Sequence, residues 1–238
     1  MKANNQHIEQ RPGTRRRAWP TARMLQRTTI VFLMLLLIAC GAPRDNNRAV
    51  VVLVDISREY ATEMEKARTL TNYLLGSLTS GDSIAIAFID NSSFSERNFI
   101  ARADFDHRPS VTTRQKHQVR AELDAFMARF SVPSAHSDIT GGVLLARDFL
   151  KARDAGHHVL FVLSDLREDL MPNLKRDMQL DLEGVQVVAV NVTRQRSDNF
   201  DPESYRNRLA QWQRRVEDSG GEWQLANDLA RLDDLEIL

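Results

Sequence analysis

Acidic and hydroxyl side chains alternate directly after one strongly apolar run of this sequence. Residues 49–54 are apolar, and Asp55, Ser57 and Glu59 then place an oxygen-bearing side chain at every second position. Magnesium and calcium ions are bound in proteins by oxygen ligands of this kind. The pattern indicates a site for a divalent cation, provided that the surrounding elements bring further oxygen atoms to the same place.

The apolar run itself predicts where that site would lie. Residues 49–54, AVVVLV, are apolar without interruption and mostly β-branched, which is typical of a strand buried on both faces in a parallel sheet. Open α/β sheets bind their ligands in the crevice at the carboxyl ends of the strands. Asp55 would lie at the carboxyl end of the predicted strand, in that crevice.

Two other loops carry polar residues at equivalent places. Ser137 opens the stretch SDITGG before a predicted helix, and Asp165 follows the apolar residues 159–163. Taken singly, each residue is better explained as a helix cap or turn residue than as a ligand. Three such junctions favour one shared site.

The rest of the sequence alternates between strand and helix patterns, with no internal repeat and no low-complexity tract. Strands separated by helical stretches of ten or more residues indicate an α/β fold in a single domain, with a doubly wound, mostly parallel sheet flanked by helices. Two stretches, residues 171–178 and the arginines of residues 206–215, are interpreted as solvated helix surface without a role. The predicted strands are 49–54, 82–89, 94–101, 158–163, 185–190 and 222–226, and the predicted helices are 59–78, 112–130, 139–153, 202–218 and 228–235.

Composition limits the class of protein. With 238 residues, 42% hydrophobic and 27% charged, the chain can form one substantial domain. The first 39 residues hold seven Lys or Arg and one Glu, which leaves 25 basic and 31 acidic residues for the remainder. An acidic body gives no reason to expect nucleic acid as a partner. The single cysteine, Cys40, excludes internal disulfides and cysteine metal clusters.

The N-terminus has the pattern of a targeting segment. Basic residues precede the apolar stretch 28–39, which is short for a membrane span and suits a signal peptide. The sequence LIAC that closes it resembles the lipobox of bacterial lipoproteins, which implies cleavage before Cys40 and a lipid on its thiol. We expect a signal peptide at 1–39, a lipidated tether at 40–47 and the domain at 48–238. An uncleaved signal anchor is the alternative, and Met24 is an alternative start.

The three loops together resemble the von Willebrand factor A family. Its metal-ion-dependent adhesion site combines a DxSxS loop, a Thr or Ser in a second loop and an Asp in a third. Asp55 and Ser57 match the first loop, Ser137 stands at the second, and Asp165 stands at the third. The resemblance implies a bound cation, magnesium first with manganese or calcium also possible, and a protein partner that offers a carboxylate to it. Together with the lipid expected on Cys40, the resemblance implies a membrane-anchored binding module in a bacterial envelope. In a Gram-negative cell, Gly41 after the cysteine favours the outer membrane, facing the periplasm.

Glu59 departs from that pattern, because the family has Ser at this position. A further carboxylate could weaken the attraction of the ion for a partner, could favour calcium, or could simply begin the helix, where a negative charge suits the dipole. A scaffold with a degenerate, metal-free site is therefore one alternative. A metal-dependent enzyme of the phosphohydrolase kind, using Asp55, is another. We expect no enzyme, because nucleotide-binding loops, a GxSxG elbow and a second catalytic Asp are all missing from the sequence.

Overall fold

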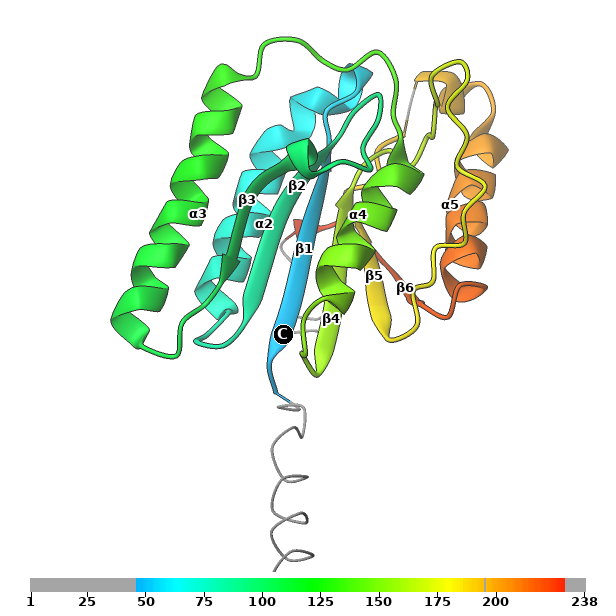
Figure 1. The fold of residues 1–238 in the computed structure, drawn as a ribbon. Helices are drawn as coiled ribbons and strands as arrows, with labels where there is room; N and C mark the ends of the chain where they lie inside the picture. The colour runs from blue at the N-terminus through cyan, green and yellow to red at the C-terminus, as the bar shows by residue number, and fades with distance from the viewer. Residues whose placement is uncertain (1–45, 195, 230–238) are drawn as a thin grey trace, which may run out of the picture. The chain divides into compact units, whose positions relative to one another are not determined.

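The computed structural model describes residues 46–194 and 196–229, without the side chains of residues 58, 59, 196 and 197. The described residues form a six-stranded sheet of order β3-β2-β1-β4-β5-β6, with helices on both faces (Figure 1). The expected α/β class is confirmed. The strands are β1 (Arg48–Asp55), β2 (Ser83–Ile89), β3 (Phe99–Asp104), β4 (His157–Leu163), β5 (Val185–Val190) and β6 (Glu222–Ala226); the helices are η1 (Arg58–Glu63), α2 (Met64–Ser77), η2 (Glu96–Asn98), α3 (Pro109–Arg129), α4 (Ile139–Lys151), η3 (Arg196–Asn199) and α5 (Pro202–Glu217).

Strand β1 lies in the middle of the sheet and pairs in parallel with β2 and β4. Its apolar residues are at most 1% exposed, because helices cover both of its faces. Strands β4, β5 and β6 continue in parallel. The carboxyl ends of β1, β4 and β5 therefore share one edge of the sheet.

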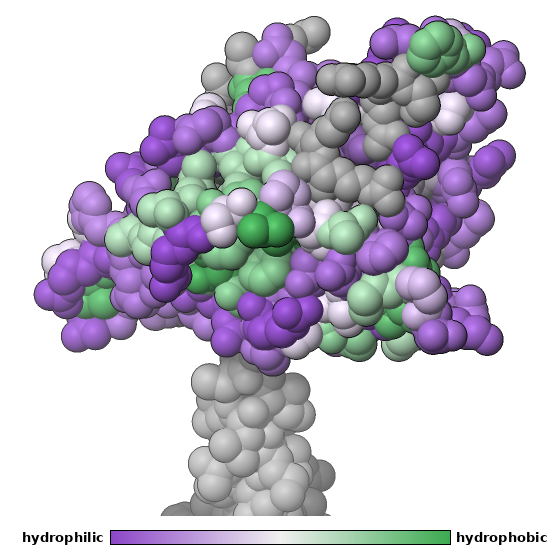
Figure 2. Space-filling model, turned by 90° about the horizontal axis from the view of Figure 1, so that it is seen from above, coloured by the Kyte–Doolittle hydropathy of each residue, from purple (hydrophilic) through white to green (hydrophobic). Residues whose placement is uncertain are grey.

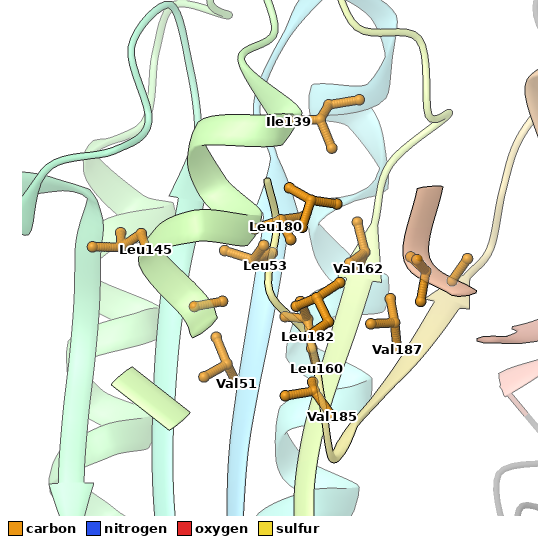
Figure 3. Close-up of a cluster of buried hydrophobic side chains, with 14 of the residues drawn as sticks. Val51, Leu53, Ile139, Leu145, Leu160, Val162, Leu180, Leu182, Val185 and Val187 are labelled. Carbon is orange, nitrogen blue, oxygen red and sulfur yellow. The ribbon is translucent and has the colours of Figure 1, made fainter. Parts of the chain in front are cut away.

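The two faces have separate apolar cores. On one face, Val51 and Leu53 pack with residues of α4 and α5, and on the other, Val50 and Val52 pack with residues of α2 and α3. Figure 3 shows part of the first core, in which Ile139 and Leu145 of α4 lie over the sheet. This alternation along a single strand is why both faces need helices.

The edge strand β3 begins later than predicted. The sequence pattern gave a strand over residues 94–101, whereas β3 runs over Phe99–Asp104 and is antiparallel to β2. Asn98 is fully buried, and its side-chain amide donates hydrogen bonds to the carbonyl of Phe88 and to Asp90. These bonds hold the preceding residues in a turn, so the strand cannot start before Phe99.

The connection between β4 and β5, which we call the crossover and define as residues 164–184, contains no helix. The interpretation of residues 171–178 as helix surface is therefore wrong. Pro172 disfavours a helix here, and Leu166 and Asn173 have φ angles of 61° and 74°, which an α-helix does not allow. The crossover is nevertheless part of the core, since Leu166, Leu180 and Leu182 are buried under α4 and α5.

The helix predicted over residues 59–78 begins as the 3-10 helix η1 before continuing as α2. The predicted helix at 228–235 falls largely outside the described residues. So do the signal peptide, the tether up to residue 45 and Cys40. In the part of the chain that is described, no helix has both the length and the apolar character needed to cross a membrane.

Candidate functional site

Asp55, the last residue of β1, is completely buried at the carboxyl edge of the sheet. Its Oδ1 accepts a hydrogen bond of 2.8 Å from the backbone N–H of Ser57. Its Oδ2 accepts hydrogen bonds from the hydroxyls of Ser137, at 2.9 Å, and Ser164, at 2.7 Å. The loops after β1, before α4 and after β4 therefore meet at one carboxylate.

The surroundings of Asp55 determine its protonation. Burial raises its pKa above the ordinary value, while hydrogen bonds from Ser164 and Ser57 oppose the rise by stabilising the ionised form. The negative charge of Asp165 raises the pKa further. Among the described side chains, no Lys or Arg forms an ion pair with Asp55. An ionised carboxylate this deeply buried needs a compensating positive charge.

Asp165 is the second residue after β4 and is half-buried. Its Oδ1 accepts a hydrogen bond of 2.8 Å from the N–H of Arg167, and its carbonyl accepts one of 2.8 Å from Nε of Arg208. Asp165 is the neighbour of Ser164, whose hydroxyl bonds Asp55 at 2.7 Å, so the loops after β1 and after β4 bring both acidic residues to the same edge of the sheet.

Comparison with known proteins identifies the fold. No protein-family model and no curated protein matches the sequence. Among solved structures, a von Willebrand factor type A protein from Catenulispora acidiphila matches 79% of this chain with a TM-score of 0.50 and 15% identity. The chain has the von Willebrand factor A fold.

This chain spans only 40% of the length of the Catenulispora protein. BatB from Bacteroides thetaiotaomicron, a conserved hypothetical protein, is similar over 80% of this chain and 95% of its own, at 13% identity and a TM-score of 0.47. Proximal thread matrix protein 1 from the mussel byssus, solved with a zinc-occupied adhesion motif, is similar over 79% of this chain and 46% of its own, at 13% identity and a TM-score of 0.44.

The residues around Asp55 suit a hard cation. The A-type fold here brings together two carboxylates, Asp55 and Asp165, with the hydroxyl residues Ser57, Ser137 and Ser164. All of these are oxygen donors, which magnesium, manganese and calcium prefer over softer ligands. Within the described residues, no three Asp, Glu, His or Cys side chains form a metal-binding group, so hydroxyls would have to supply part of the ligand set.

Glu59 belongs to η1, but its side chain lies outside what the structure describes. The neighbouring Tyr60 is buried, and its hydroxyl donates a 3.2 Å hydrogen bond to the carbonyl of Asn191 at the end of β5. This contact fixes η1 beside the carboxyl edge. The role of Glu59 as a cation ligand stays a prediction.

Ser164 is the residue of this site that the sequence pattern did not single out. It is fully buried, and besides its bond to Asp55 its Oγ accepts a 3.0 Å hydrogen bond from the N–H of Leu166. A hydroxyl residue directly before Asp165, at the end of a buried strand, was the available signal. Its partner could not be identified without the pairing of β1 with β4.

Two arginines of α5, Arg208 and Arg215, bond to the loops of the site. Arg208 bonds the carbonyl of Asp165 and forms an ion pair of 2.8 Å with Asp198, whose side chain is fully buried. Arg215 donates to the hydroxyl of Thr140, at 2.7 Å, and to Glu168, at 3.3 Å. The interpretation of these arginines as having no role is wrong, because they join α5 to the loops of the site.

Proposed function

We propose that this chain is a binding module that holds a divalent cation at Asp55 and engages a protein partner through that cation. The observation that carries the proposal is the Asp55 carboxylate itself. It is completely buried, it receives hydrogen bonds from three separate loops, and no described side chain supplies the positive charge that its ionised form requires. A cation at the carboxyl edge would supply that charge.

The proposed ligands are Asp55 and Asp165 with the hydroxyls of Ser57, Ser137 and Ser164, and Glu59 as predicted from its spacing. We propose magnesium as the ion, with manganese and calcium as ions that the same oxygen donors accept. Such an ion, when bound, attracts a carboxylate from a partner protein. The carboxylates and hydroxyls of the chain would hold the ion together, and the hydroxyls of Ser137 and Ser164 also orient the Asp55 carboxylate.

The surface beside the site supports a protein as the partner. A groove of about 770 Å³ between the start of the crossover and α5 is lined by Leu166 and Arg167, the residues that follow Asp165. Two apolar side chains on loops of the same sheet edge are exposed, Val132 at 75% and Phe200 at 93%. The surface seen from above is otherwise largely hydrophilic with separate apolar patches (Figure 2). Non-obligate protein interfaces likewise combine a polar, solvent-accessible rim with apolar contacts.

We further propose that a lipid on Cys40 anchors this module to a bacterial membrane. The support is the LIAC sequence that closes a basic and then apolar N-terminal segment. In a Gram-negative cell, Gly41 after the cysteine favours the outer membrane, with the domain in the periplasm.

Calorimetric titration of the full chain with magnesium, manganese and calcium tests the proposal. We expect saturable binding of at least one ion, and loss of that binding in Asp55→Asn, with circular dichroism as the check that the variant is folded. A folded wild type that binds none of the three ions would instead be a metal-free scaffold. Metal-dependent turnover of a phosphate ester that Asp55→Asn abolishes would favour the enzyme alternative.

A further inference from the structure

The loop before α4 and the crossover are bonded to each other next to the site. Ser137 and Asp169 exchange backbone hydrogen bonds of 2.9 Å and 3.0 Å. Three residues after Ser137, the N–H of Thr140 donates a 2.7 Å hydrogen bond to the side chain of Glu168. The crossover begins at Ser164 and Asp165, so these bonds connect two of the three loops that meet at Asp55.

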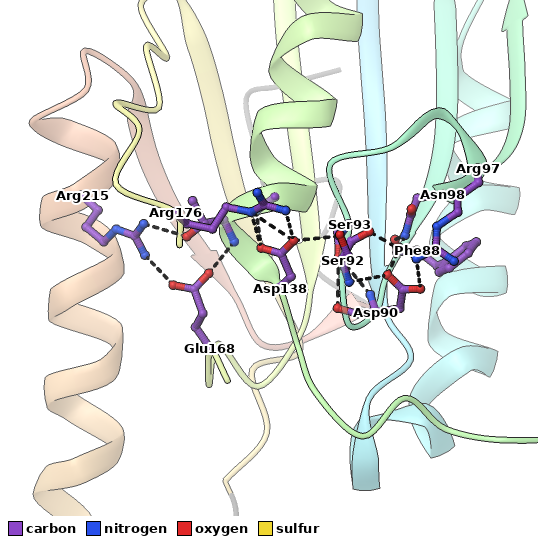
Figure 4. Close-up of polar contacts among 12 residues, drawn as sticks. Phe88, Asp90, Ser92, Ser93, Arg97, Asn98, Asp138, Glu168, Arg176 and Arg215 are labelled. Carbon is purple, nitrogen blue, oxygen red and sulfur yellow. Dashed lines mark hydrogen bonds and ion pairs between the residues drawn. The ribbon is translucent and has the colours of Figure 1, made fainter. Parts of the chain in front are cut away.

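A buried ion pair also joins the loop before α4 to the crossover. Asp138 has a fully buried side chain, and the side chain of Arg176 is only 13% exposed. Nε of Arg176 lies 2.9 Å from Oδ1 of Asp138, and Nη2 lies 2.6 Å from Oδ2, so both carboxylate oxygens are held by one guanidinium (Figure 4). A bidentate pair of this kind fixes the relative orientation of the two side chains as well as the distance between them.

The carboxylate of Asp138 also organises the backbone around it. It accepts hydrogen bonds from the N–H of Gly141, at 2.9 Å, and from the N–H of Ser93, at 2.8 Å. A side chain on Gly141 would collide with this carboxylate, so glycine is required for the contact. Asp138 thereby joins the start of α4, the β2–β3 loop and, through Arg176, the crossover.

The position of Ser137 depends on this arrangement. Its backbone is bonded to Asp169 of the crossover, the next residue is Asp138, and its hydroxyl reaches Asp55 at 2.9 Å. A displacement of the loop would move that hydroxyl away from Asp55. Among the described side chains, Arg176 bonds to Asp138 and to none of the proposed cation ligands, so it acts on Ser137 through Asp138.

We propose that Arg176 is a positioning residue for the cation site, which fixes the loop of Ser137 against the loop of Asp165 through its ion pair with Asp138. The effect on cation affinity rests on the proposed function, whereas the effect on loop order does not. Residues that orient metal ligands without contacting the ion typically change metal affinity ten- to a hundredfold when replaced.

A second buried ion pair provides a matched control. Arg48 and Asp82 form a pair of 2.8 Å whose side chains are 14% and 1% exposed, nearly the burial of Arg176 and Asp138. This pair lies at the start of β1 and just before β2, at the opposite edge of the sheet. Replacing Arg48 therefore removes a similar interaction without touching the loops of the site.

The first measurement compares Arg176→Met with Arg48→Met in the full chain by calorimetric titration with magnesium, manganese and calcium. Both variants should unfold at lower temperature, because each leaves a buried carboxylate without its partner. Only Arg176→Met should bind the ion about ten- to a hundredfold more weakly. Arg176→Lys, which keeps the charge but loses the paired geometry, should fall between the wild type and Arg176→Met. Equal affinity in Arg176→Met and Arg48→Met would overturn the proposal.

The second measurement is made with chelator present and needs no cation. The amide protons of Ser137 and Asp169 should exchange with solvent at least about tenfold faster in Arg176→Met than in Arg48→Met, because loosened loops open locally more often. If the wild type binds no cation, the proposed function fails and this exchange measurement alone decides the role of Arg176. If Arg176→Met does not fold, the same comparison is made with Arg176→Lys. Unchanged exchange in the folded variant would contradict the proposal.

Discussion

Ser137 and Asp55 are 82 residues apart in the sequence, yet the Ser137 hydroxyl donates a 2.9 Å hydrogen bond to Oδ2 of Asp55. The contact exists because β1 occupies the middle of the sheet and α4 begins above its carboxyl end. Ser164, directly after β4, the neighbour of β1, donates to the same oxygen. Two hydroxyls from distant parts of the chain thus converge on one buried carboxylate.

With chelator present, the contribution of Asp55 to stability should increase as the pH falls through its folded-state pKa. Burial raises the folded-state pKa of Asp55 above its unfolded value of about 3.9, so the native state binds this proton more tightly than the unfolded state. The free energy of unfolding therefore decreases as the pH rises through the interval between these two pKa values. Urea titrations at a series of pH values measure this slope, which should become shallower in Asp55→Asn. The same slope in the variant would show that another group is responsible.

Ser164→Ala should destabilise the chain by about 1.5–3 kcal/mol at neutral pH, because it removes a hydrogen bond to an ionised, buried carboxylate. Ser77→Ala is the control, since Oγ of Ser77 donates a 3.0 Å hydrogen bond to the uncharged carbonyl of Leu74 and should contribute only about 0.5–1.5 kcal/mol. Urea unfolding with chelator compares the two variants. A larger loss in Ser77→Ala would speak against an ionised Asp55.

Glu59→Ser should stabilise the metal-free chain and shift its preference from calcium toward magnesium. The change removes a third negative charge from a site that holds Asp55 and Asp165, and magnesium takes fewer carboxylate ligands than calcium. Thermal melts of the wild type and the variant with chelator, magnesium and calcium provide the comparison. A loss of about 0.3–1 kcal/mol with unchanged ion preference would assign Glu59 to the helix dipole instead.

Cys40→Ser should leave the N-terminal segment uncleaved and abolish labelling of the chain by a fatty-acid probe in bacterial cells. Cys40 is the only thiol in the sequence, so no other cysteine could accept the lipid. Labelling of the variant at the wild-type level would contradict the lipid anchor.

The sequence was sufficient for the parts of the structure that local pattern determines. The apolar run before Asp55 predicted a central parallel strand, and the rule that such strands present ligands at their carboxyl ends predicted where Ser137 and Asp165 would lie. The crossover could not be predicted in this way. Its core contacts, such as that of Leu180, and the ion pair of Arg176 with Asp138 join residues tens of positions apart, and no periodic pattern accompanies them.

The contacts of α5 with the site could not be predicted from the sequence either. Arg208 and Arg215 lie on a helix face with many charges, which sequence patterns interpret as solvent-exposed. Their acceptors, the carbonyl of Asp165 and the hydroxyl of Thr140, become evident only once α5 is packed beside the crossover.

A cation held between the loops of β1 and β4 is the central claim, and thermal unfolding of the full chain with and without magnesium tests it most directly. An ion that binds only the native state stabilises it by about 2.7 kcal/mol at a concentration 100 times its dissociation constant. Asp181→Asn, which changes an exposed carboxylate paired with Lys151 away from the site, should keep the whole increase in melting temperature. Asp165→Ala should lose it. The same magnesium-dependent increase in Asp165→Ala as in the wild type would contradict the claim.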